Sequence, residues 1–221
     1  MKTAVITGAN RGIGLALVQS LKAHYRIHAI CRSSSPELEK EDVEIIDGID
    51  VASAQGVARL AEQMKAISID LLINNAGLLR PSSLEGIETE LTDWRAQYEI
   101  NALAPLRVTS ALSVQLVEGG KVVIITSRMG SISDNSSGGA YAYRMSKAAV
   151  NSAAMSLAHE FHPRRIAVGL FHPGYVRTGM TGGSGHVDPK EAARGLTRRI
   201  DELDLISSGQ FRHANGEPLP W

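Results

Sequence analysis

The sequence contains a single cysteine, Cys31, among its 221 residues. One cysteine excludes an internal disulfide and any metal site built from several cysteines. It is compatible with a reducing compartment, so we expect a cytoplasmic protein. The sequence also lacks a charge of one sign, since 23 basic residues balance 23 acidic ones. Nothing in that balance indicates nucleic acid or an anionic membrane as a partner.

Long apolar runs are missing as well. None approaches the roughly 20 residues that a membrane span requires. The chain enters an apolar segment directly at Lys2–Ile6, without the charged and apolar regions of a secretory signal. Repeats and low-complexity tracts are also lacking. With 43% apolar residues, the sequence predicts one globular domain over residues 1–221.

Short apolar runs alternate with amphipathic stretches, a pattern typical of parallel β-α units. Runs such as Val122–Ile125 are apolar on both faces, as in strands covered by helices on two sides. We therefore predict an α/β fold: a doubly wound, Rossmann-like parallel sheet of about seven strands that binds ligands at its carboxyl edge. The expected strands are Thr3–Thr7, Arg26–Cys31, Val43–Ile46, Leu71–Asn74, Val122–Thr126, Ala167–Phe171 and Gln210–Arg212. Helices are expected to begin near Gly12, Ser53, Thr92, Tyr141 and Asp188.

A glycine-rich turn, Gly8 to Gly14, follows the first expected strand and opens the first expected helix. Small residues let the backbone approach a pyrophosphate, and a helix N-terminus supplies N–H groups and a positive dipole end. The alternative is a turn without a ligand. The strand-turn-helix context favours dinucleotide binding.

Tyr143 and Lys147 are four residues apart in the expected helix Tyr141–Phe161. Residues at this spacing share one helix face. An ammonium beside a phenol favours the phenolate, so we expect the pKa of Tyr143 to fall below its usual value near 10. Such a phenol can exchange a proton with a carbonyl or alcohol oxygen. The alternative is an ordinary contact on a helix surface.

The glycine spacing Gly-x-x-x-Gly-x-Gly, the segment Asn74–Gly77, Asn101 and the Tyr143-x-x-x-Lys147 pair occur here in one order. Together they resemble the short-chain dehydrogenase/reductase family over essentially the whole chain. The resemblance implies that Tyr143 is the general acid in reduction and that Lys147 holds the nicotinamide ribose. It implies that Ser127 binds the substrate oxygen and that Asn101 holds a water on a proton path.

The same resemblance implies a cofactor site. Asp50 and Val51 would contact the adenine, Asn75–Gly77 would line the adenosine side, and Val176 and Thr178 would contact the carboxamide. The full set of implied cofactor residues is Gly8, Asn10, Arg11, Gly12, Ile13, Gly14, Arg32, Asp50, Val51, Asn75, Ala76, Gly77, Tyr143, Lys147, Pro173, Gly174, Val176 and Thr178.

Charge suggests which cofactor is bound. An acidic residue after the second strand would hold the ribose hydroxyls of NAD, but this sequence has Ile30-Cys31-Arg32 there, and Arg11 lies in the glycine loop. Two guanidinium groups favour a 2′-phosphate, hence NADP(H) over NAD(H). The alternative is that both arginines are solvated surface charges.

Ser127 has a competitor. Tyr143 lies sixteen positions after Ser127, which is more than is usual in that family, and Ser131 lies closer to Tyr143. We favour Ser127 because it directly follows an expected strand, at the carboxyl edge of the sheet. The extra length lies in Ser133–Gly139, which we expect to form a loop.

Three histidines are further candidate site residues. His159 and His162 lack an evident third ligand, and Pro163 ends their helix, so solvated histidines are favoured over a metal site. We predict no metal. His172, at the end of the sixth strand, is favoured as a structural residue over one that shapes the site.

Within the family, Ser127–Ile132, Gly138–Lys147, His172–Gly174 and the tail Gly216–Trp221 resemble the branch of the bacterial C-factor signalling protein and the sniffer carbonyl reductases. This implies NADPH-linked reduction of a small-molecule ketone or aldehyde. Two alternatives stay open: a dinucleotide-binding signalling protein with incidental turnover, and an NAD-dependent alcohol dehydrogenase. We expect a short substrate lid at 175–187 and a homodimer formed through the helices Trp94–Leu116 and Tyr141–Phe161.

Overall fold

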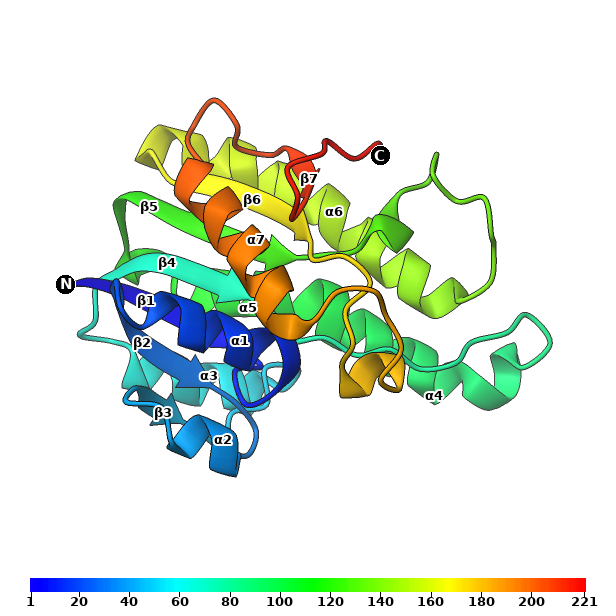
Figure 1. The fold of residues 1–221 in the computed structure, drawn as a ribbon, viewed down its shortest axis with the longest axis horizontal. Helices are drawn as coiled ribbons and strands as arrows, with labels where there is room; N and C mark the ends of the chain where they lie inside the picture. The colour runs from blue at the N-terminus through cyan, green and yellow to red at the C-terminus, as the bar shows by residue number, and fades with distance from the viewer.

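The computed structural model describes all residues, 1–221, and is built on one seven-stranded parallel sheet (Figure 1). The strand order is β3-β2-β1-β4-β5-β6-β7. The sequence therefore predicted the fold class correctly. The strands are β1 (Lys2–Thr7), β2 (Tyr25–Ile30), β3 (Glu44–Ile46), β4 (Ile69–Asn74), β5 (Leu116–Ile125), β6 (Ala167–His172) and β7 (Phe211–His213).

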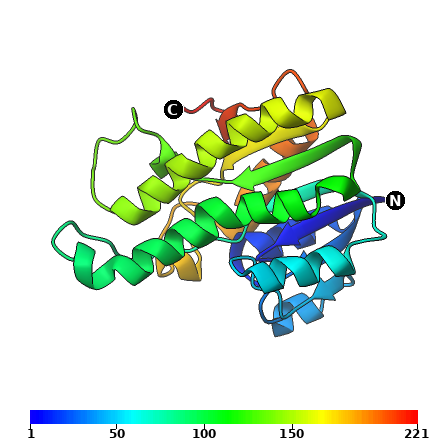
Figure 2. The same ribbon diagram turned by 180° about the vertical axis from the view of Figure 1, so that it is seen from behind.

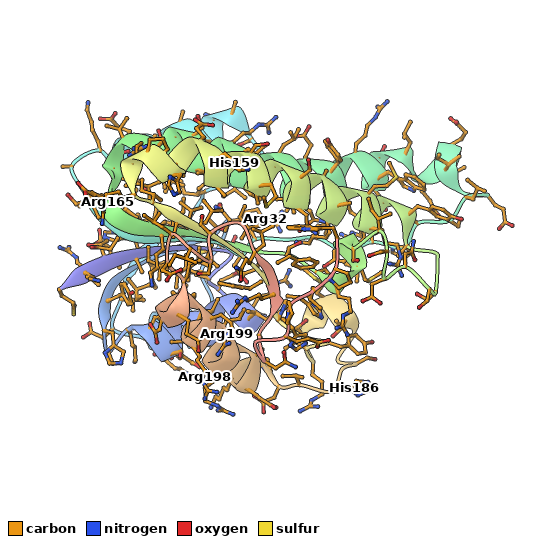
Figure 3. The ribbon with its side chains drawn as sticks, turned by 90° about the horizontal axis from the view of Figure 1, so that it is seen from above. Arg32, His159, Arg165, His186, Arg198 and Arg199 are labelled. Atoms are coloured by element: carbon orange, nitrogen blue, oxygen red, sulfur yellow. The ribbon has the colours of Figure 1, made fainter.

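Helices cover both faces of the sheet. Figure 1 shows α1 and α7 in front of it, and Figure 2, the view from behind, shows α3, α5 and α6 on the opposite face. The view from above separates the two helix layers, with His159 on α6 and Arg198 and Arg199 on α7 (Figure 3). No helix is both long enough and apolar enough to cross a membrane. The helices are α1 (Gly12–Leu21), α2 (Pro36–Glu39), α3 (Ala54–Gln63), α4 (Ile87–Tyr98), α5 (Ala104–Ala111), α6 (Tyr141–Phe161) and α7 (Pro189–Glu202).

Strand β5 explains why the core lies on both sides of the sheet. Successive side chains of a strand point to opposite faces. Val122 and Ile124 accordingly join the apolar cluster under α3, α5 and α6, whereas Val123 and Ile125 join the cluster under α1 and α7. A run that is apolar at every position is thus satisfied only in a central strand.

Local capping chemistry sets two of the helix starts. The Asp188 side chain accepts a hydrogen bond from Glu191 N at 2.9 Å, and Pro189 occupies the first turn of α7. At α3 the Ser53 hydroxyl accepts from Gly56 N at 2.9 Å. Both patterns satisfy N–H groups that the first turn cannot pair internally. The two predicted starts are confirmed.

The predicted helix Trp94–Leu116 is wrong in its bounds. Helix α4 begins at Ile87, a π-helical turn follows at Glu99–Leu103, α5 ends at Ala111, and Leu116 already belongs to β5. The π turn changes the direction of side chains within one otherwise helical segment, and such turns are frequent at functional sites. Asn101 lies in that turn.

Candidate functional site

The glycine turn between β1 and α1 needs residues without side chains. Gly8 and Gly12 have φ values of +65° and +55°, which disfavour residues with a Cβ. A Cβ on Gly14 would lie 2.1 Å from the Gly8 carbonyl oxygen, so α1 approaches the turn closely. Arg11 at the N-cap makes no side-chain capping bond. Because no side chain caps this helix start, its N–H groups are left available to an anion.

Thr7 and Asn75 hold this turn against the end of β4. The Asn75 side-chain amide donates to the carbonyl oxygens of Thr7 (2.9 Å) and Gly8 (3.1 Å). The Thr7 hydroxyl accepts from Asn75 N at 3.0 Å and from Ala76 N at 3.1 Å. Asn75 and Ala76 were predicted to line the adenosine side. Thr7 was not predicted, and the pairing of β1 with β4 brings it there.

The end of β2 lies beside the glycine turn. Asn10 Nδ2 donates to the Ser33 carbonyl at 2.9 Å, and the Ser35 hydroxyl donates to the Asn10 carbonyl at 2.7 Å. These bonds join the turn that carries Arg11 to the segment that carries Arg32, which is labelled in Figure 3. Neither guanidinium forms an ion pair within 4.0 Å. Both charges are thus free of carboxylate partners.

Asp50 and Val51 follow β3 at the same edge. The Asp50 carboxylate accepts from Ala52 N at 3.0 Å, and Val51 is 8% exposed. A Cβ on Gly56 would lie 2.1 Å from the Asp50 carbonyl oxygen. The first turn of α3 therefore fixes the backbone at Asp50.

Asn101 ties three segments together from within the π turn. Its side-chain oxygen accepts from Leu78 N at 2.8 Å, and its Nδ2 donates to the Leu78 carbonyl at 2.7 Å and to Ser146 Oγ at 3.0 Å. Leu78 directly follows Gly77, whereas Ser146 precedes Lys147 on α6. The side-chain amide of Asn101 thus joins the segment after Gly77 to the part of α6 that carries Lys147. The sequence analysis did not predict Ser146 as a partner of Asn101.

Tyr143 and Lys147 lie together at the start of α6 and are 8% and 5% exposed. The Lys147 Nζ atom is 5.8 Å from the centre of the Tyr143 ring and donates to the Ile125 carbonyl at 3.0 Å. Ser82, from the loop after β4, accepts from Ala142 N at 3.1 Å. It supplies a cap that α6 lacks in its own sequence, since Ala140 precedes the helix.

The predicted direction of the Tyr143 pKa shift is wrong for the structure described. Burial raises the pKa of Tyr143 to about 12, although interaction with the Ser127 side chain lowers it in part. Burial also lowers the pKa of Lys147 to about 8. Loss of water disfavours the charged form of either group. The four-residue spacing alone did not indicate how deeply both side chains are buried.

The structure separates the two candidate serines. The Ser127 side chain interacts with the Tyr143 phenol and lowers its pKa in part. Its hydroxyl also accepts a hydrogen bond from Met129 N at 3.1 Å, at the start of the 3₁₀ turn Arg128–Gly130. Ser131 instead donates to the Trp221 backbone oxygen at 3.0 Å and accepts from Asp134 N at 3.1 Å. This geometry favours Ser127 as the partner of Tyr143. Residues 133–139 form an exposed loop, as the sequence predicted.

The segment after β6 closes the other side of the edge. Gly174 has φ +95°, and a Cβ on Gly12 would lie 3.4 Å from the Thr178 methyl group. Pro173–Thr178 therefore extends to the glycine turn. Val176 pairs with Val187 in an isolated bridge, so residues 176–187 form a closed loop.

The histidines do not form a metal centre. No group of three or more histidine, cysteine, aspartate or glutamate side chains is gathered anywhere in the protein. The His172 and His213 rings meet edge to face at 5.0 Å. Burial, together with the charges of His213 and Arg128, lowers the pKa of His172 to about 3, so this imidazole is neutral at physiological pH.

Similarity to known proteins identifies the family. The family model described as short chain dehydrogenase matches residues 2–187. The chain belongs to the short-chain dehydrogenase/reductase family. The resemblance found in the motifs is thereby confirmed, and this family member is an oxidoreductase of the NAD(P)-binding type.

Two named relatives differ in what their names describe. This short-chain dehydrogenase/reductase is 36% identical to the 1-hydroxy-2-glutathionyl-2-methyl-3-butene dehydrogenase of a Rhodococcus species over 230 aligned positions, covering all of both chains. It is 43% identical to the C-signal protein of Myxococcus xanthus over 155 positions, which cover 69% of this chain and 93% of that protein.

Solved structures agree on the fold of this short-chain dehydrogenase/reductase. The carbonyl reductase Sniffer of D. melanogaster superposes with a TM-score of 0.90 at 29% identity, with full coverage of both chains. The NADPH-bound carbonyl reductase from chicken fatty liver gives 0.89 at 28% identity, covering 100% of this chain and 99% of that one.

Proposed function

We propose that this protein reduces a ketone or aldehyde to an alcohol with NADPH, and that Tyr143 donates the proton. The observation that carries the proposal is the buried arrangement of Tyr143, Lys147 and Ser127 at the carboxyl edge of the sheet. With a pKa of about 12, the Tyr143 phenol is protonated at neutral pH, as a general acid must be.

The residues at the edge fit a dinucleotide. The start of α1, which no side chain caps, offers N–H groups to a pyrophosphate. Asp50 and Val51 are suited to the adenine, Asn75–Gly77 to the adenosine side, and Pro173–Thr178 to the nicotinamide. Lys147 would hold the nicotinamide ribose.

The protein groups then have distinct tasks. When bound, the reduced cofactor supplies a hydride to the carbonyl carbon. Tyr143 donates its proton to the carbonyl oxygen. Ser127 accepts a hydrogen bond from Met129 N and interacts with the Tyr143 phenol, so its hydroxyl proton can be donated to the substrate oxygen beside Tyr143. The Lys147 ammonium, with its pKa near 8, can return a proton toward Tyr143 close to physiological pH.

Two arginines support the choice of NADPH. Arg11 and Arg32 are free of ion pairs, and the Asn10–Ser33 bond joins the segments that carry them, which supports a shared contact with a 2′-phosphate. A relative from Burkholderia multivorans described as having bound NADP supports the same choice, with a TM-score of 0.87 at 26% identity.

A second candidate function is oxidation of an alcohol by the same site. The 36%-identical relative is named a dehydrogenase, and catalysis in that direction would need Tyr143 as a base. A signalling role with incidental turnover is the third candidate, and the C-signal relative supports it. The three candidates predict different outcomes in one assay: reduction of a carbonyl, oxidation of an alcohol, or cofactor binding with little turnover.

Association into a dimer is also proposed. An apolar hollow of about 220 Å³ lies between α4 and α6, with Trp94, Tyr98, Ala142 and Met145 among its lining residues. Tyr98 and Met145 are 44% and 57% exposed, and a second copy would cover them. A monomeric mass in light scattering at micromolar concentration would contradict this proposal. The segment 175–187, which contains the closed loop 176–187, is proposed as the substrate lid.

The test is NADPH oxidation against a panel of aldehydes, ketones and quinones, with NADP- and NAD-linked oxidation of the matching alcohols beside it. Tyr143→Phe keeps the ring and removes only the hydroxyl. We expect it to lower kcat by about 10²-fold or more, the usual contribution of general acid catalysis, while NADPH binding stays near that of the parent. Retained turnover would remove Tyr143 from the chemistry. Bound NADPH without any turnover would favour the signalling role.

A further inference from the structure

The tail of the chain contacts the turn that carries Ser127. Four donors converge on the backbone oxygen of Trp221: Ile132 N at 3.0 Å, Ser133 N at 2.8 Å, Ser131 Oγ at 3.0 Å and Ser133 Oγ at 2.8 Å. We call this set the Trp221 clasp. A single oxygen that collects four donors from one short loop fixes the backbone of that loop.

The tail itself is anchored to the sheet. Leu219 N donates to the Phe211 carbonyl of β7 at 2.9 Å, and the Leu219 side chain is only 6% exposed. The Trp221 and Phe211 rings stack with centres 5.6 Å apart. The clasp therefore ties the loop to a buried part of the fold. In Figure 1 the red tail lies above β6 and β7, where the chain ends at C.

The turn Arg128–Gly130 lies between this tail and α6. A Cβ on Gly130 would lie 2.8 Å from the carbonyl carbon of Lys147, so the turn rests directly on the helix that carries the site. Arg128 pairs with Asp134 of the following loop at 3.1 Å and with Glu217 of the tail at 3.3 Å. These exposed ion pairs add little stability by themselves, whereas the clasp consists of short hydrogen bonds.

The loop held by the clasp continues from the turn that carries Met129, since Ser131 N donates to the Arg128 carbonyl at 2.9 Å. Met129 N donates to Ser127 Oγ at 3.1 Å, which leaves the hydroxyl proton of Ser127 to be donated elsewhere. If the turn shifts, this bond is lost and the hydroxyl can rotate. The direction of the Ser127 proton therefore depends on residues that are distant in sequence.

We propose that residues 217–221, acting through the Trp221 clasp, are a positioning element that orients the Ser127 hydroxyl toward the substrate oxygen. The proposal rests on the proposed function for its catalytic consequence. Its structural half, the placement of Met129 N, is independent of any substrate. No residue of the clasp contacts the reacting atoms in this proposal.

The test removes two clasp donors with the double variant Ser131→Ala/Ser133→Ala, which leaves both backbone amides in place. Ser136→Ala is the matched control, because Ser136 lies in the same loop, is exposed and makes no side-chain hydrogen bond. The first readout is hydrogen exchange of the Met129 amide by NMR. We expect exchange to accelerate in the double variant and not in the control. An unchanged exchange rate of the Met129 amide would overturn the proposal. This measurement needs no substrate.

The second readout is kcat, measured in the parent and in a Ser127→Ala background. We expect the double variant to lower kcat roughly three- to tenfold in the parent, the effect of about one hydrogen bond, with KM for NADPH unchanged. In the Ser127→Ala background it should have almost no further effect. An equal loss in both backgrounds would show a general structural role and overturn the proposal. Absence of turnover in the parent would count against the proposed function, and the exchange result alone would then decide the positioning of Met129 N.

Discussion

Replacing Lys147 with methionine should make the protein more stable and inactive. The Lys147 ammonium is 5% exposed, makes no ion pair, and has the Ile125 carbonyl as its hydrogen-bond acceptor. Burial lowers its pKa to about 8. At neutral pH the folded protein must therefore hold a charge in a site that favours the neutral amine, and methionine removes that charge while keeping most of the volume.

The magnitude follows from the shift. A fall from the ordinary 10.5 to about 8, at about 1.4 kcal/mol per pKa unit, corresponds to a penalty of roughly 3 kcal/mol at pH 7. Loss of the bond to the Ile125 carbonyl returns about 1 kcal/mol. We expect Lys147→Met to raise the free energy of unfolding by about 2 kcal/mol at pH 7.

The pH dependence has a defined sign. Between pH 8 and 10.5 the unfolded chain binds more protons at this lysine than the folded protein does, so the parent gains stability as pH rises through that window. The advantage of Lys147→Met should therefore be largest below pH 8 and should shrink toward pH 10.

Urea unfolding of both proteins at pH 7 and pH 9.5 measures the effect. Lys190→Met is the control, because Lys190 is exposed on α7, and it should change stability by no more than about 0.5 kcal/mol. The reasoning is refuted if Lys147→Met is less stable than the parent at pH 7, or if its advantage is the same at both pH values. A stabilised variant without turnover would indicate that the lysine is retained for function.

Three further predictions concern other parts of the site. Arg32→Asp should weaken NADPH binding by about 10- to 100-fold, which is the value of a charge-assisted hydrogen bond. It should weaken NADH binding much less, and equal losses of affinity in fluorescence titrations would contradict the 2′-phosphate assignment. Gly14→Ala should destabilise the protein by about 2–3 kcal/mol or more, because its Cβ would lie 2.1 Å from the Gly8 carbonyl oxygen. A Cβ on Gly179 would meet nothing within 4 Å, so the control Gly179→Ala should have the melting temperature of the parent. Equal melting temperatures for all three proteins would refute the steric argument. The pKa of Tyr143 is raised to about 12, so between pH 10 and 12 the folded protein keeps a proton that the unfolded chain loses. The free energy of unfolding of the parent should therefore fall by up to roughly 3 kcal/mol over this range relative to Tyr143→Phe. Parallel curves of stability against pH would show that the phenol is not buried as described.

Local sequence patterns were sufficient for most of the fold. The run Val122–Ile125 indicated a central strand because each of its side chains needs an apolar neighbour. Asp188 and Pro189 indicated a helix start because the Asp188 carboxylate accepts a hydrogen bond from an N–H group of the first turn, and a proline at that turn has no N–H group to pair. The π turn at Asn101 left no such mark, and the predicted continuous helix Trp94–Leu116 missed it. A π turn depends on packing against neighbouring segments, here at Leu78 and Ser146.

The sequence by itself determined the succession of strands and helices along the chain, the glycine turn and the placement of Tyr143 and Lys147 on one helix face. These features depend on residues a few positions apart. Only the tertiary structure decided the directions of the two pKa shifts, because burial depends on everything packed around a side chain. It also gave Ser127 and Ser131 different contacts, and it brought Ser82 to the start of α6 and Trp221 to the loop before it. Those contacts join residues 60 and 90 positions apart, and no short-range periodicity encodes which distant segment will meet another.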